Sequence, residues 1–103
     1  MAGSVILDDK TAVAFSSRGF DVVQAAIREV LGAIAPELIE PVYESLDVGC
    51  MPFIALDELD DEGATQFYIA TKQALSDWSQ RNLEPFPEWG ELIEKLEADK
   101  RVS

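Results

Sequence analysis

The chain has 103 residues, with 20 Asp and Glu side chains against 8 Lys and Arg, and its formal net charge is −12. At this length one domain with one hydrophobic core is expected, so we predict a single domain over residues 1–103. The apolar content of 48% is too high for a disordered acidic tail. The charge is therefore expected on the outside of a folded body.

Two residue types are scarce: the chain contains no histidine and one cysteine, Cys50. The lack of histidine excludes the His-based triads of serine and cysteine hydrolases, and a structural zinc site would need several Cys and His. A single Cys forms no internal disulfide, and its thiol is interpreted as buried or incidental. The first residues lack the positive region of a signal peptide, and no apolar run is long enough for a membrane span. We expect a cytoplasmic protein without metal or cofactor.

Two short apolar runs, residues 4–7 and 12–15, are separated by the polar link Asp8-Asp9-Lys10-Thr11. Short apolar runs around a turn-forming link are typical of a β-hairpin, which we predict for the start of the sequence. A further short apolar run, residues 53–56, follows the chain break Gly49-Cys50-Met51-Pro52. A buried strand is favoured there, although a single helical turn is an alternative for so short a run.

Helical spacing of apolar residues begins at Asp21, which stands in an N-cap position, and ends before Pro36. A helix is therefore predicted over residues 21–35. Pro36 fits the first turn of a second short helix that carries apolar side chains as far as Leu46. Pro41 complicates this interpretation, because proline removes a backbone donor and kinks a helix interior. Two turns or an irregular connection remain an alternative for this segment.

The longest periodic pattern starts at Asp60 or Asp61, either of which is a suitable cap, and runs to Asn82. After a linker over residues 83–87, Pro87 fits the start of a last helix over 88–100, where the cations near its end suit the helix dipole. The elements together predict a small α+β domain, with an N-terminal hairpin and a short further strand packed with three to four helices. We expect seven apolar side chains to form its core: Ile27, Leu31, Phe67, Leu75, Trp78, Leu92 and Leu96.

The most unusual feature of the sequence is electrostatic. Over the 43 positions between Arg28 and Lys72 there is no basic residue, while ten acidic residues occur there. This charge either serves solubility around the whole body or gathers on one side to meet a cationic partner. Such acidity argues against binding to nucleic acid or to an anionic membrane, because phosphates are recognised by Lys and Arg. Nine of these acids are the candidate partner-binding residues: Glu37, Glu40, Glu44, Asp47, Asp57, Glu58, Asp60, Asp61 and Glu62.

The acids before the long helix have two other interpretations. With Gly63 at position six of a calcium loop, position twelve is Ile69, where a bidentate glutamate is required. We therefore predict no calcium site there and interpret the acids as capping the helix.

Paired carboxylates could also serve a small glycosidase, but a deep aromatic cleft is hard to build in 103 residues. No enzyme activity is expected.

In size, acidity, α+β layout and lack of catalytic motifs, the chain resembles the immunity proteins that bacteria pair with cationic nuclease toxins. The resemblance implies a non-enzymatic inhibitor that covers the basic groove of a toxin domain with carboxylates. A rival hypothesis is a structural or regulatory subunit that acts through an apolar homodimer interface. Salt separates the two, because charge-led association weakens with ionic strength and apolar association does not.

Overall fold

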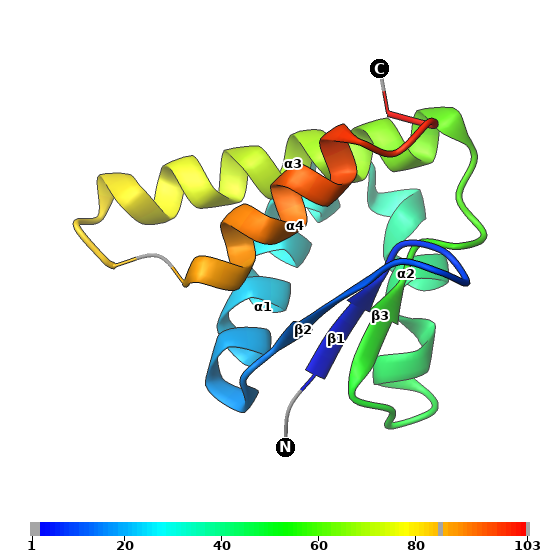
Figure 1. Ribbon diagram of the computed structural model, residues 1–103, viewed down its shortest axis with the longest axis horizontal. Coiled ribbons are helices and arrows are strands. Elements are labelled where there is room, and N and C mark those ends of the chain that lie inside the picture. Colours follow the sequence, from blue (N-terminus) through cyan, green and yellow to red (C-terminus); the bar gives the residue numbers. More distant parts are fainter. Residues whose placement is uncertain (1–2, 85, 103) are drawn as a thin grey trace.

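A three-stranded sheet and four α-helices make up the computed structural model, which describes residues 3–84 and 86–102 (Figure 1). The predicted α+β class, the N-terminal hairpin and the short further strand are confirmed. Within the described ranges no helix is long and apolar enough to cross a membrane. In chain order the elements are β1 Gly3–Ile6, β2 Ala12–Phe15, α1 Ser17–Ile34, a 3-10 turn η1 Pro36–Leu38, α2 Ile39–Asp47, β3 Phe53–Ala55, α3 Asp61–Gln80 and α4 Pro87–Glu97.

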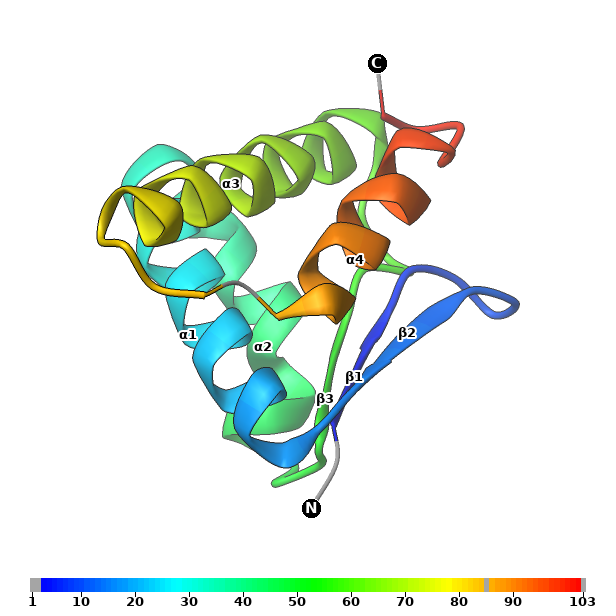
Figure 2. The same ribbon diagram turned by 60° about the vertical axis from the view of Figure 1, so that its left-hand side comes forward.

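The sheet has the strand order β2-β1-β3, with β1 antiparallel to β2 and parallel to β3. Asp8 forms the hairpin turn, since its Oδ1 accepts the main-chain N–H groups of Lys10 and Thr11 at 2.8 and 2.7 Å. Burial alternates along every strand, and the inward-facing residues are Val5, Val13, Phe15 and Ile54. The helices lie on that side of the sheet, so the core lies between the sheet and the helices (Figure 2).

Helix α1 begins earlier than the predicted residue 21, so the prediction of Asp21 as its cap is wrong. Ser16 is the N-cap, and its hydroxyl accepts the N–H of Gly19 at 3.1 Å. The extra turn buries Phe20 against the start of β1, where a Cβ on Gly3 would lie 2.2 Å from the Phe20 ring. Gly3 therefore permits a close approach that no other residue allows. At the other end Ile34, predicted on the apolar stripe, is 44% exposed.

The two prolines that complicated the second helix are both accommodated. Pro36 opens the 3-10 turn η1, which runs directly into α2. Pro41 is the third residue of α2, and the first four N–H groups of a helix have no partner within it. A proline there removes no helical hydrogen bond, so the short helix forms as predicted. It buries Val42 and Tyr43, and the Tyr43 hydroxyl donates to the main-chain oxygen of Gln24 in α1 at 2.7 Å.

The long helix α3 is capped by Asp60, as predicted, through acceptance of the Gly63 N–H at 2.7 Å. Its buried face turns toward Ala70 and Ala74, and the two predicted core residues Leu75 and Trp78 are only half-buried. The other five predicted core residues are fully buried. Phe67 and Thr71 share this buried face, so Leu75 and Trp78 lie at its edge.

The partial burial of Leu75 sets the result we expect for its truncation. Leu92 is completely buried in α4, and Leu92→Ala should cost about 2 to 5 kcal/mol, the range for a truncated core leucine. Leu75→Ala removes fewer contacts and should cost less than about 2 kcal/mol. Urea unfolding of the two variants measures both values. Equal losses would mean that Leu75 is as much a core residue as Leu92.

Candidate protein-binding surface

The nine candidate acidic residues are all exposed, and they belong to only two parts of the fold. Four come from η1 and α2, and five from the segment 57–62, which joins β3 to the first turn of α3. The many contacts between α2 and β3 bring these two parts together. The acidic surface, as we call it, consists of Glu37, Glu40, Glu44, Asp47, Asp57, Glu58, Asp60, Asp61 and Glu62.

Shallow grooves show which of these carboxylates are neighbours. Glu44 of α2 shares a groove of about 340 Å³ with Asp57 and Glu58 from the far side of β3. A second groove joins acids from η1 and from the start of α3, namely Glu37, Asp60 and Glu62. A third groove, along α2 itself, is lined by Glu40, Glu44 and Asp47. Asp61 lines none of these three grooves. Its negative charge helps to raise the pKa of Arg101.

Asp47 differs from the other acids because a base from outside the acidic stretch pairs with it. Arg28 of α1 donates two hydrogen bonds to its carboxylate, at 2.8 and 2.6 Å, and packs over the ring of Tyr43. These bonds lower the pKa of Asp47 and raise that of Arg28. The stretch itself contains no base, but Arg28, 19 residues away in sequence, is adjacent to Asp47 in space and neutralises it.

The capping interpretation of the acids before α3 is confirmed for Asp60, whose carboxylate accepts the Gly63 N–H. Asp61 and Glu62 follow in the first turn, where negative charge complements the helix dipole. Within residues 3–84 and 86–102, no three His, Cys, Asp or Glu side chains are grouped so as to hold a metal ion. The side chains of Asp60, Asp61 and Glu62 are all exposed.

Arg101 holds the segment 57–62 in place, a role that the sequence did not reveal. Its guanidinium donates to the main-chain oxygens of Leu56 and Leu59, at 2.7 and 3.1 Å, and to that of Leu7 at 2.9 Å. Arg101 is one of the cations expected near the end of the last helix, where they would suit its dipole. That expectation is wrong for Arg101, because α4 ends at Glu97 and the guanidinium bonds main-chain oxygens just past β1 and β3.

Asp99 completes this arrangement. Its carboxylate accepts from Arg101 at 2.8 and 3.0 Å, and the two side chains are only 8% and 19% exposed. The hydrogen bonds from Arg101 lower the pKa of Asp99, despite the opposing effect of burial. The ion pair with Asp99 positions Arg101, and the hydrogen bonds of Arg101 join Leu56 and Leu59 to Leu7, just past β1. The sequence spacing gave no signal for it, because the bonded atoms belong to the main chain.

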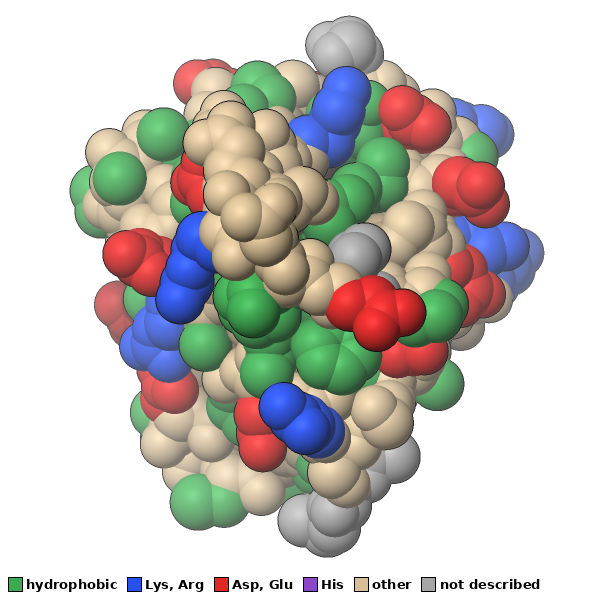
Figure 3. Space-filling model, turned by 90° about the vertical axis from the view of Figure 1, so that its left-hand side faces the viewer, with side chains coloured by type: hydrophobic (Ala, Val, Ile, Leu, Met, Phe, Trp, Pro, Cys, Tyr) green, Lys and Arg blue, Asp and Glu red, His purple; other side chains and the backbone are tan. Residues whose placement is uncertain are grey.

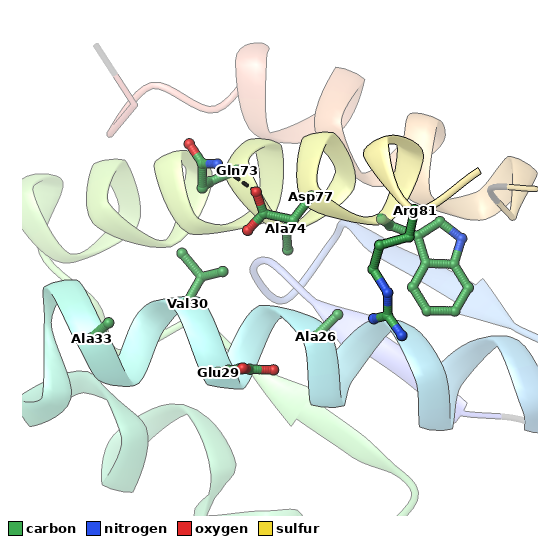
Figure 4. A pocket seen from close by; sticks show the side chains of 9 residues that line it. Ala26, Glu29, Val30, Ala33, Gln73, Ala74, Asp77 and Arg81 are labelled. Atoms are coloured by element: carbon green, nitrogen blue, oxygen red, sulfur yellow. Dashed lines mark hydrogen bonds between the residues drawn. The ribbon is translucent and has the colours of Figure 1, made fainter. Parts of the chain in front are cut away.

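The opposite end of the molecule has a mixed character. Figure 3 shows Lys and Arg side chains there, interspersed with carboxylates around a patch of apolar side chains. A groove of about 450 Å³ lies between α1 and α3, with Arg81 packed over the Trp78 ring and the Glu29 and Asp77 carboxylates on its walls (Figure 4). Asp77 already accepts a hydrogen bond from Gln73. This arrangement contains no nucleophile–base pair.

Phe86 and Cys50 lie in two of the connections between elements. Phe86 is half-buried at the start of α4, with its ring centroid 6.4 Å from that of Trp78, so it packs on the aromatic core. Cys50 is exposed at a positive φ of 53°. Of the two expectations for its thiol, buried or incidental, the first is wrong. It lies in the loop between α2 and β3, beside exposed Val48 and Met51.

We compared the chain with known protein families, curated proteins and solved structures. A scan against models of known protein families finds no match. The chain is similar to the immunity protein CdiI of Burkholderia pseudomallei, with 27% identity over 104 residues that cover 99% of this chain and 95% of CdiI. It is also similar to a chain in the solved complex of the CdiA-CT toxin from Burkholderia pseudomallei E479 with its cognate CdiI immunity protein. There the TM-score is 0.87 and the identity 26%, over 98% of this chain and 99% of that chain. The resemblance to bacterial toxin-immunity proteins is confirmed in sequence and in fold.

Proposed function

We propose that this protein is an immunity protein that neutralises a toxin domain by binding it, without an enzymatic step of its own. The observation that carries the proposal is the similarity to CdiI over nearly the whole chain, in sequence and in fold. The toxin partner of the solved relative is named with it, and a fold shared from end to end supports the same use here. The proposed site of action is the cytoplasm.

The acidic surface is the proposed contact. Its carboxylates gather from η1, α2 and the segment 57–62, so they can face a continuous basic area on a partner. A nuclease-like toxin must present Lys and Arg to phosphate, and acids placed over that groove would exclude the substrate. Complementary charge also speeds the encounter and rejects surfaces of the same sign.

The proposal implies that the toxin domain is encoded beside this chain's gene, and the test uses that domain. Producing that domain in a bacterial host should arrest growth, and co-production of this chain should restore it. With the purified proteins, the association rate should fall as salt rises from about 0.05 to about 0.5 M, because exposed charges are screened. An association that is unchanged or stronger at high salt would support the apolar-interface hypothesis, and a lack of binding would overturn the proposed function.

A further inference from the structure

The face of the sheet that points away from the helices is apolar. The strand registers place Ala14, Ser4 and Phe53 in one row across the sheet, and Ala12, Ile6 and Ala55 in the next. Five of these six outward residues are apolar, and Ser4 is the exception. An antiparallel hairpin with one solvated face normally alternates apolar residues with polar ones. The outer face of this sheet therefore lacks the polar side chains that solvent exposure favours.

This face is only partly covered: α2 borders it at β3, and the β2 side is open. Ala12 and Ala14 are exposed, and Ile6, Phe53 and Ala55 are half-buried, whereas the inward residues of the same strands are at most 2% exposed. The helices lie on the other side of the sheet (Figure 2). Apolar surface of this kind points to an interaction site when polar residues border it.

The outer sheet face is continuous with the acidic surface. Ile6, Phe53 and Ala55 form the apolar side of the groove that Glu44, Asp57 and Glu58 border. Apolar side chains and carboxylates therefore line one depression between β3, α2 and the segment that follows β3. A partner that occupies this groove meets an apolar floor and a negative rim at the same time.

We propose that the outer sheet face is the apolar centre of the toxin-binding surface, with the acidic surface as its charged rim. The inference rests on the proposed function and specifies the partner's chemistry: one or two apolar side chains flanked by Lys or Arg. An apolar centre excludes water and holds the complex together, while rim charges act mainly on the rate of encounter. The sheet face thus controls dissociation, and the acidic surface controls association.

The test compares two variants with the same change in charge, measured against the toxin domain encoded beside this chain's gene. Ala14→Glu places a carboxylate on the exposed outer sheet face, and Ala25→Glu places one at an exposed position on α1. We expect Ala14→Glu to raise the dissociation rate at least about tenfold and Ala25→Glu to change it less than about twofold. Circular dichroism and the urea midpoint show whether both remain folded.

Phe53→Thr is the second variant, because threonine keeps the preference for a strand and removes the ring from the groove. It too should speed dissociation and leave the association rate near that of the parent. If the parent binds and neutralises the toxin while folded Ala14→Glu and Phe53→Thr dissociate at the parent rate, the sheet face is not in the interface. The proposed function then stands and this inference falls. If the parent does not bind, the proposed function fails first.

Discussion

Reversing three neighbouring carboxylates of the acidic surface is expected to slow association with the toxin domain by at least about tenfold. Glu44→Lys, Asp57→Lys and Glu58→Lys all lie at one groove, so the variant would place three cations opposite the basic partner. All three side chains are exposed. The fold should therefore be retained, because surface substitutions usually change stability by no more than about 0.5 kcal/mol each.

The matched control reverses three exposed acids elsewhere, with Asp21→Lys on α1 and Glu91→Lys and Glu94→Lys on α4. Both triple variants have the same net charge, so a difference between them reports the position of the charges. Stopped-flow or surface plasmon resonance measurements at about 0.15 M salt give the association rates. Equal slowing in both variants would mean that only net charge matters and that the acidic surface has no special place.

We expect Arg101→Ala to lower the free energy of unfolding by about 3 kcal/mol, more than the replacement of any other charged residue by alanine. The variant would remove a donor from the main-chain oxygens of Leu7, Leu56 and Leu59 and the guanidinium from the Asp99 carboxylate. The Leu56 oxygen would keep the Leu59 N–H, and the Asp99 carboxylate would keep the main-chain N–H of residue 101. Urea unfolding at neutral pH measures the loss, and Arg81→Ala is the control. Arg81 packs over Trp78 from an exposed position and should cost less than about 1 kcal/mol. A similar cost for both variants would contradict the role assigned to Arg101.

The pH dependence provides a second measurement of this ion pair. Because the pKa of Asp99 is lowered in the folded state, its contribution is complete above the pKa of the unfolded carboxyl, about 3.9. The contribution is lost as pH falls through the lower, folded value. Below about pH 4, the free energy of unfolding of Arg101→Ala should therefore fall less steeply with decreasing pH than that of the parent. Equal slopes would mean that the carboxylate is not stabilised by the guanidinium.

The sequence predicted the elements well because each is encoded locally. The hairpin follows from two apolar runs around Asp8, and α3 follows from a cap at Asp60 and a long period. The errors lie where a local pattern had two solutions. Asp21 and Ser16 both suit an N-cap, and the structure uses Ser16 because the longer helix buries Phe20. Leu75 lies beside the buried face of α3, which carries Phe67, Ala70, Thr71 and Ala74.

For the candidate site, the sequence predicted which acidic residues belong to it but not which residues they contact. The stretch without bases identified acids that the structure places on two adjacent parts of the fold, but no local pattern gave their partners. Arg28 reaches Asp47 across 19 residues, and Arg101 binds main-chain oxygens that have no sequence signature. The outer sheet face was missed for a similar reason. Its apolar rows form only when strands far apart in sequence pair, so no single run of residues displays them.

The bond from Arg101 to Leu7 joins residues 94 positions apart, which bears on the kinetics of folding. Closing so long a loop costs entropy before the contact repays it, so such contacts form late. Interactions made after the transition state slow unfolding and leave the folding rate almost unchanged. The bonds from Arg101 to Leu7, Leu56 and Leu59 are therefore expected to slow the unfolding of the segment that bears Asp57 and Glu58, and to change the folding rate little.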